Sequence, residues 1–128
     1  MLKLMRYALP KAMLRPTLAA AYADPATLTA DLLNRYYDLM LAPGVRDAVI
    51  ARMGQVVLQD PVPLLQRITA PTMLLWGEKD AMIPATNAAD YKRELPNSTL
   101  VTLPNLGHLP FEEAPARSLE PVRAFLAK

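Results

Sequence analysis

The sequence predicts an α/β fold with two parts: a helical segment over residues 1–66, followed by a parallel β-α-β-α unit over residues 67–128. The first observation is that apolar residues recur at helical spacing in the first half of the chain. The second is that two short apolar runs follow Pro71, separated by a stretch that can hold a helix. A strand, a crossover helix and a second strand in this order form a parallel pair, and such crossovers are right-handed in nearly all proteins.

In the first half, the best-defined helix is expected over residues 27–41, where leucine, tyrosine and methionine side chains form one apolar stripe. Asp24-Pro25 or Thr27 offers its start signal, and Pro43-Gly44 its end signal. Three further helical stretches are expected: short helices broken by proline over residues 1–22, a helix over residues 45–58, and a single turn around residues 64–68.

In the second half, residues 72–76 form a continuous apolar run, which is typical of a strand buried on both faces. Threonines in the run 99–103 indicate a second strand that lies nearer the edge of the sheet. Helices are expected over residues 85–95 and over the C-terminal stretch up to Leu126. A strand buried on both faces needs a neighbour on each side, and the sequence contains no third strand, so the predicted sheet is truncated within this chain.

Composition limits the classes of function. With 128 residues, 52% of them hydrophobic, the chain has the length and the core-forming residues of one domain. The net charge is +2 with both signs interspersed, so no basic stripe marks a nucleic-acid partner. The absence of cysteine excludes a disulfide framework and a thiol nucleophile, and with a single histidine no zinc or other metal site is expected.

Residues 1–23 carry four cationic side chains and no acid, and Ala21-Tyr22-Ala23 is similar to a signal-peptidase cleavage site. A secretory signal needs an unbroken apolar stretch of roughly 7–15 residues. Two prolines and two cationic residues between positions 10 and 16 interrupt that stretch here. The chain also lacks the roughly 20 consecutive apolar residues of a membrane-spanning helix. These features favour a cytoplasmic protein with no membrane partner.

The loops that follow the two expected strands hold an acid and a base. Asp80 comes four residues after Trp76, and His108 five residues after Leu103. Because the carboxyl ends of parallel strands lie along one sheet edge, with neighbouring strands about 4.8 Å apart, the two loops are expected side by side. Taken singly, such an aspartate is more often a turn former and a lone histidine more often structural. As a pair, a carboxylate fixes the imidazole tautomer and lets the second ring nitrogen act as a base.

Residues beside this pair have expected supporting roles. Gly77 and Gly107 let the backbone turn sharply after each strand, which aims the side chains over the sheet edge. Met82, Ile83 and Leu109 can line an apolar substrate pocket, although packing within the loops is the more common role of such residues.

The C-terminal half resembles the end of the α/β-hydrolase family. The resemblance covers roughly residues 67–128. It rests on residues 68–80, Ile83-Pro84, Gly107–Pro110, Glu113 and Pro115. The stretch 34–44 is similar to the helical cap of esterase-like and haloalkane-dehalogenase-like members, and this implies that residues 1–66 form a cap or lid segment.

The resemblance implies roles for individual residues. Asp80 corresponds to the acid and His108 to the general base of a Ser-His-Asp triad, as in esterase-like members. Glu113 corresponds to a structural carboxylate near the last helix, and Glu78 is the less suitable of the two acids in its loop. The family chemistry requires neither a metal nor an organic cofactor.

The nucleophile of this chemistry is missing from the sequence. In the family it lies upstream of the acid and the histidine, in a Gly-x-Ser-x-Gly turn. Neither Ser98 nor Ser118 occurs in such a motif, and the glycines are never four residues apart. The oxyanion loop is also absent, so we expect the chain alone to be inactive. Aspartate can replace serine as the nucleophile in related enzymes, and the sequence does not distinguish the two.

Two functions remain open from the sequence. The first is the cap and C-terminal part of a serine-type acyl hydrolase of a small apolar ester-like substrate, which requires an N-terminal hydrolase half as partner. The second is a non-catalytic module that covers its open strand edge by homodimerising and binds an apolar ligand. A tight dimer favours the module, and a sticky, partly molten species favours the hydrolase part.

Overall fold

The computed structural model describes residues 10–56 and 58–127, and their contacts group them into two compact units. The first unit contains the described residues up to Ala19 together with Leu28–Gln59. The second contains Ala20–Thr27 and the described residues from Asp60 onward. These units differ from the expected division at residue 66, because Ala20–Thr27 and residues 60–66 group with the second unit.

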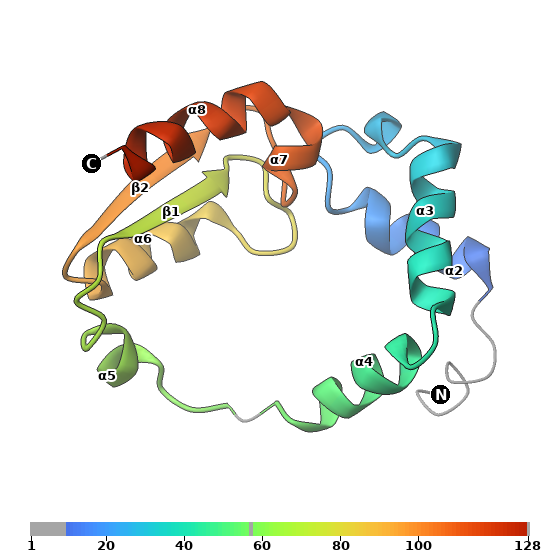
Figure 1. The fold of residues 1–128 in the computed structure, drawn as a ribbon, viewed down its shortest axis with the longest axis horizontal. Coiled ribbons are helices and arrows are strands. Elements are labelled where there is room, and N and C mark those ends of the chain that lie inside the picture. Colours follow the sequence, from blue (N-terminus) through green and yellow to red (C-terminus); the bar gives the residue numbers. More distant parts are fainter. Residues whose placement is uncertain (1–9, 57, 128) are drawn as a thin grey trace. The chain divides into compact units, whose positions relative to one another are not determined.

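The first unit is helical and consists of α2 (Lys11–Ala19), α3 (Ala30–Leu41) and α4 (Val45–Gly54) (Figure 1). Helix α3 packs against both α2 and α4. It begins later than expected because Thr29 is its N-cap: the threonine side chain accepts a hydrogen bond from the Leu32 amide at 3.2 Å. Helix α4 ends at Gly54, before the expected end at Leu58. The expected helices over residues 1–9 lie outside the described residues.

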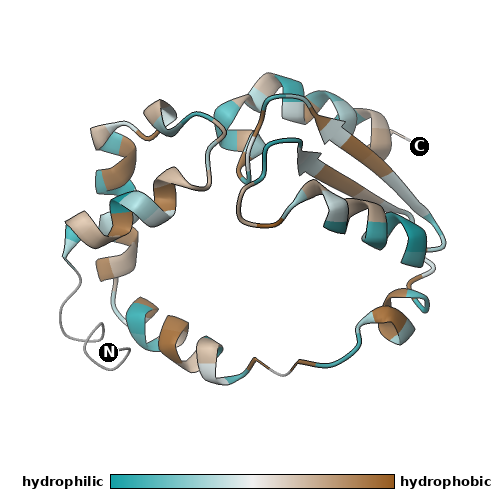
Figure 2. Ribbon diagram, turned by 180° about the vertical axis from the view of Figure 1, so that it is seen from behind, coloured by the Kyte–Doolittle hydropathy of each residue, from teal (hydrophilic) through white to brown (hydrophobic). Residues whose placement is uncertain are grey.

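The second unit is the predicted parallel β-α-β-α arrangement. Strands β1 (Thr72–Gly77) and β2 (Ser98–Leu103) pair in parallel, and Gly77 is opposite Leu103 at their carboxyl ends. Helices α6 and α8 lie on opposite sides of the pair (Figures 1 and 2). The helical elements are η1 (Pro25–Thr27), α5 (Val62–Leu65), α6 (Ala85–Glu94), α7 (Pro110–Glu113) and α8 (Pro115–Leu126), of which η1 and α7 were not expected.

Strand β1 is half-buried, whereas its sequence predicts burial on both faces. Figure 2 shows hydrophobic residues along the middle of both strands, yet those of β1 from Met73 to Trp76 all stay partly accessible. The reason is that β2 is the one strand neighbour of β1 among the described residues. One face of β1 does meet α6, where the Trp76 and Tyr91 rings lie 6.2 Å apart between centroids.

Several buried residues of the second unit lie where the strands end. Leu103 and Leu106 are buried at the end of β2, and Ala21 and Tyr22 pack beside the loop that follows it. Ser118 of α8 is buried as well, and its hydroxyl donates to the Pro110 carbonyl oxygen at 2.7 Å. These contacts tie the loops at the sheet edge to the rest of the unit.

The helices in the described part of the chain are short, the longest having 12 residues. Crossing a bilayer takes about 20 apolar residues, and no helix in residues 10–56 or 58–127 has that length and hydrophobicity. The cytoplasmic location and the absence of a membrane partner remain predictions.

Candidate active site

The structure brings the expected acid and base into contact. Nδ1 of His108 lies 2.8 Å from Oδ2 of Asp80, so the predicted contact is confirmed. Asp80 follows β1 and His108 follows β2, and the parallel register places the ends of the two strands side by side. The Asp80 side chain is 5% exposed and that of His108 32%, so the base is the more accessible partner.

The second carboxylate oxygen of Asp80 is bound by its own loop. Oδ1 accepts hydrogen bonds from the amides of Met82 and Ile83, both at 2.9 Å. Burial raises the pKa of Asp80, but the hydrogen bonds from the Ile83 amide, His108 and the Met82 amide outweigh it, so the pKa lies below its ordinary value. Asp80 is therefore ionised at neutral pH, and Nδ1 of His108 carries the hydrogen that it donates.

Two glycines allow the two loops to approach. A Cβ on Gly77 would overlap the carbonyl oxygens of Leu106 and Gly107, and a Cβ on Gly107 would lie 2.6 Å from the Ala23 amide nitrogen. Close backbone approach thus requires glycine at both positions. The sequence suggested sharp turns instead, but neither Gly77 nor Gly107 has a positive φ. The Lys79 amide also donates to the Leu106 carbonyl oxygen at 2.8 Å, which ties the acid loop to the base loop.

The other two acids of the expected site, Glu78 and Glu113, accept hydrogen bonds from backbone amides. Glu78 accepts a hydrogen bond from the Asn105 amide at 3.1 Å through Oε2, while Asp80 is the acid that meets His108. Glu113 lies at the end of α7, directly before α8, and its carboxylate accepts from Gly107 at 2.6 Å and from Ala23 at 2.9 Å. These contacts agree with the structural role that the family resemblance implies for Glu113.

A small apolar cavity of about 120 Å³ adjoins the pair. Of the expected pocket residues, Ile83 lines it, whereas Met82 and Leu109 are not among the lining residues. Met82 is 48% exposed and contributes its backbone amide to Asp80. The lining residues are Leu75, Trp76, Gly77, Asp80, Ile83, His108 and Pro110.

Three side chains of this cavity, those of Leu75, Trp76 and Pro110, are not predicted by the sequence. Trp76 closes one wall, and its indole N–H donates to the Ile83 carbonyl oxygen at 3.0 Å. Pro110, two residues after His108, is buried and lines the cavity as well. Leu75 and Trp76 lie near the end of β1 before the acid loop, and Pro110 lies two residues after the base. These positions are the signal that identifies them.

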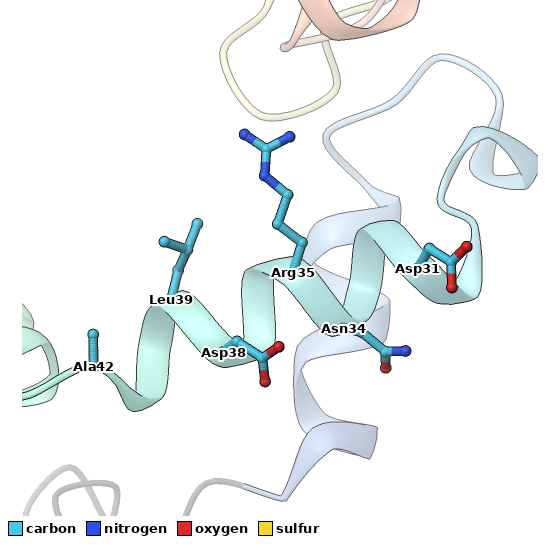
Figure 3. Close-up of a pocket in the computed structure, with 6 residues that line it drawn as sticks. All are labelled: Asp31, Asn34, Arg35, Asp38, Leu39 and Ala42. Atoms are coloured by element: carbon cyan, nitrogen blue, oxygen red, sulfur yellow. The ribbon is translucent and has the colours of Figure 1, made fainter.

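A second, wider depression of about 500 Å³ runs along α3 in the first unit. Its lining residues recur at helical spacing, so it follows one exposed side of the helix. Figure 3 shows the Arg35 side chain pointing away from the Asp38 carboxylate. The lining residues are Asp31, Asn34, Arg35, Asp38, Leu39 and Ala42.

No metal-ligand cluster is present in the described residues: they hold no group of three or more histidine, cysteine, aspartate or glutamate side chains able to bind a metal ion. The chemistry that the pair itself supports is proton transfer. Because Nδ1 of His108 binds Asp80, Nε2 is the nitrogen that can exchange a proton with a reactant, and the carboxylate stabilises the imidazolium that forms.

The chain is similar to curated proteins over part of their length. It is 29% identical over 120 residues to a dihydrolipoyllysine-residue acetyltransferase component of the acetoin cleaving system of Pseudomonas putida, covering 90% of this chain and 31% of that protein. It is 38% identical over 61 residues to a pimeloyl-[acyl-carrier protein] methyl ester esterase of Pectobacterium atrosepticum, covering 48% and 24%. The chain therefore spans less than a third of the length of either relative.

Solved structures and a family model agree on the fold. The meta-cleavage product hydrolase CumD of Pseudomonas fluorescens IP01 superposes with a TM-score of 0.81 at 16% identity, covering 96% of this chain and 47% of that one. Residues 2–120 match the model of the alpha/beta hydrolase family. This chain belongs to the alpha/beta hydrolase family.

Proposed function

We propose that this chain supplies the acid and the general base of a serine-type acyl hydrolase. The observation that carries the proposal is the 2.8 Å contact between Asp80 and His108 at the ends of two parallel strands. A carboxylate that accepts from Nδ1 fixes the tautomer in which Nε2 is the basic nitrogen. Membership of the alpha/beta hydrolase family supports the same role.

In the proposed reaction, His108 Nε2 removes the proton of a nucleophilic hydroxyl while its oxygen attacks the substrate carbonyl carbon. The imidazolium then gives that proton to the leaving alcohol oxygen as the C–O bond breaks, which leaves an acyl-enzyme. Water, deprotonated by the same nitrogen, then attacks the acyl carbon. The imidazolium returns this proton to the oxygen of the nucleophile as the acyl C–O bond breaks, which releases the acid and regenerates the hydroxyl. Asp80 stays ionised in both steps because its pKa is held below the ordinary value.

The nucleophile of this reaction is provided by a segment outside the given sequence. Ser118 is buried and its hydroxyl binds the Pro110 carbonyl oxygen. Ser98 begins β2, at the opposite end of the strand from the His108 loop. The proposed partner is a segment that carries the nucleophile turn and the oxyanion donors, with residues of the first unit acting as a cap.

The proposed substrate is a small apolar ester. The cavity beside the base is lined mainly by Leu75, Trp76, Ile83 and Pro110, which offer an apolar wall to an acyl or alkoxy group. One curated relative of known activity is named as a methyl ester esterase, which supports ester chemistry.

The purified chain alone is expected to be inactive. An aspartate and a histidine without a positioned nucleophile and oxyanion donors give little rate enhancement. The test is hydrolysis of p-nitrophenyl acetate and butyrate by wild type and His108→Ala. Both proteins are expected to hydrolyse the esters no faster than buffer. Robust hydrolysis that disappears in His108→Ala would contradict the proposal that the nucleophile lies outside the given sequence.

A graft tests the pair itself. Residues 67–128 of this chain replace the segment that aligns with them in the Pectobacterium esterase, and the rest of that esterase is expected to supply the nucleophile. In an active graft, Asp80→Asn is expected to lower kcat by about 10⁴-fold and His108→Ala by about 10⁶-fold. Asp90→Asn is the matched control, because its carboxylate faces Arg93 on exposed α6. A folded graft that keeps its activity in His108→Ala overturns the proposal.

The open edge of β1 favours a second candidate function. Among the described residues β1 has one strand neighbour, so its other edge offers backbone groups for pairing with a second copy. This candidate is a non-catalytic, homodimerising module that binds an apolar ligand. Sedimentation equilibrium and a hydrophobic-dye assay together decide between the two functions. A tight, well-folded dimer supports the module, and a monomer that binds the dye supports the hydrolase part.

A further inference from the structure

The segment Ala20–Thr27 is fixed against the loop that carries the base. The His108 amide donates to the Ala21 carbonyl oxygen at 2.8 Å. Ala21 and Tyr22 are 4% and 3% exposed, so this segment is part of the interior of the second unit. The position of His108 therefore depends on residues far away in the sequence.

Glu113 joins this segment to the base loop. Its Oε1 accepts a hydrogen bond from the Gly107 amide at 2.6 Å, and its Oε2 accepts one from the Ala23 amide at 2.9 Å. An ionised carboxylate is an acceptor at both oxygens, so it can satisfy two backbone donors at once. Gly107 immediately precedes His108, and one of the two bonds thus ends one peptide unit from the base.

Steric contact at Gly107 shows how tightly the two backbones meet. A Cβ there would lie 2.6 Å from the Ala23 amide nitrogen and 2.8 Å from the Ala21 carbonyl oxygen. No side chain fits between the two backbones at this point. The glycine permits the approach, and the Glu113 carboxylate bridges the two amides.

We propose that Glu113 is a positioning residue for His108: its carboxylate clamps the amides of Gly107 and Ala23 together and thereby holds the imidazole against Asp80. The inference rests on the proposed function of the Asp80–His108 pair. It assigns to Glu113 an effect on the orientation of the base in addition to its effect on stability.

The conservative variant Glu113→Gln breaks the clamp with little change in volume. A glutamine amide has one acceptor oxygen and one donor NH₂, so one of the two backbone amides then faces a donor. Glu112→Gln is the matched control on the same short helix. The Glu112 carboxylate accepts from the Tyr22 hydroxyl at 2.7 Å, so it anchors the same segment through a side chain instead of through Gly107.

The experiment uses the full chain labelled with ¹⁵N-histidine. His108 is the single histidine, so its ring signals need no further assignment. We expect a downfield Nδ1–H proton in the wild type, bound to Asp80 and protected from exchange. Asp80→Asn is expected to remove it, and Glu113→Gln to remove it or to speed its exchange about tenfold, the factor expected for one lost charged hydrogen bond. Glu112→Gln is expected to keep the wild-type signal.

The outcomes separate this inference from the proposed function. If Asp80→Asn leaves the ring proton unchanged, the Asp80–His108 contact is wrong and the proposed function fails. If Asp80→Asn removes it and Glu113→Gln keeps it, only the positioning role is overturned. An equal loss in Glu112→Gln also overturns it, because anchoring of the segment then explains the effect.

A measurement on the wild type covers the case in which Glu113→Gln does not fold. The clamp predicts that the amide protons of Gly107 and Ala23 exchange with solvent through one shared opening that also releases the His108 ring proton. The inference is supported if these three protons are similarly protected from exchange and if their exchange rates change together as denaturant is added. Protection of the ring proton that persists while both amides exchange freely contradicts it.

Discussion

The acid and the base of the candidate site are held in place in different ways. Asp80 is oriented by the amides of Met82 and Ile83, which belong to its own loop. His108 is oriented by the Ala21 carbonyl oxygen, and its loop is tied through Glu113 to Ala23, a contact that spans 90 positions. The acid is therefore positioned by a local motif, whereas the position of the base depends on the tertiary fold of the second unit.

The largest expected effect comes from the point where the two loops meet. A methyl group at Gly77 would overlap the carbonyl oxygens of Leu106 and Gly107, which are backbone atoms and cannot turn aside. Gly77→Ala is therefore expected to lower the free energy of unfolding by about 3 kcal/mol, the upper end of ordinary overpacking. Urea denaturation followed by tryptophan fluorescence measures the change.

Gly54→Ala is the control for this substitution. Gly54 ends α4, and a Cβ there meets no atom within 4 Å. Alanine in a helix is favoured over glycine by about 0.5–1 kcal/mol, so this variant is expected to be neutral or stabilising. A Gly77→Ala protein as stable as Gly54→Ala would show that the two loops do not approach as described.

Loss of the local acid ranks second. Asp80→Asn removes the charge that accepts from His108, Met82 and Ile83, and is expected to cost about 2 kcal/mol of unfolding free energy at pH 7, as for hydrogen bonds to charged groups. The measurement is urea denaturation at a series of pH values, with Asp90→Asn as the exposed control.

The pH dependence of this difference has a definite sign. The pKa of Asp80 lies below its ordinary value of 3.8 in the folded chain, so ionised Asp80 stabilises the fold above that value. The contribution is lost as the pH falls from about 3.8 through the folded-state pKa. The difference between wild type and Asp80→Asn is therefore expected to shrink as the pH falls below about 3.8. A difference that grows below pH 3.8 would contradict the local account of the acid.

The smallest expected effect concerns a remote anchor of the base. Tyr22→Phe removes the hydroxyl that donates to Glu112 across 90 positions, while the buried ring stays. We expect a loss of about 1 kcal/mol in unfolding free energy, typical of one hydrogen bond. Tyr91→Phe is the control, because Tyr91 is 38% exposed and its ring, which meets Trp76, is kept; it is expected to stay within about 0.5 kcal/mol. Equal losses of unfolding free energy in the two variants would contradict the claim that Tyr22 stabilises the loop of the base.

The contact between acid and base is predictable from the sequence because both residues follow strands. Two apolar runs joined by a helix form a parallel pair, and the ends of parallel strands share one edge. Short motifs after Trp76 and Leu103 therefore suffice to bring Asp80 and His108 together. The order of the elements in the second unit is predictable for the same reason.

The remote support of the base is not predictable from the sequence. The atoms of Ala21 and Ala23 that hold the base loop are a backbone carbonyl oxygen and a backbone amide, which every such residue possesses. No pattern in the sequence marks them, and the contact arises only when the second unit folds. The partial burial of β1 is also a property of the tertiary structure, because β1 has one strand neighbour among the described residues.

Helix boundaries illustrate a finer limit. Thr27 and Thr29 both have side chains that suit an N-cap, and the sequence pattern favours Asp24-Pro25 or Thr27 as the start of α3. In the structure Thr29 accepts from the Leu32 amide, while Pro25–Thr27 forms the short helix η1 in the second unit. Because Thr27 is part of η1, Thr29 is the threonine that caps α3.

A double-mutant cycle on stability tests the central claim most directly, namely that the single imidazole and the Asp80 carboxylate touch. The free energy of unfolding is measured at pH 7 for the wild type, Asp80→Asn, His108→Ala and the double variant. The 2.8 Å contact predicts a coupling energy of about 1 kcal/mol or more, in the range of residues in direct contact. Additivity of the two single effects within about 0.3 kcal/mol, as for distant residues, would contradict the account.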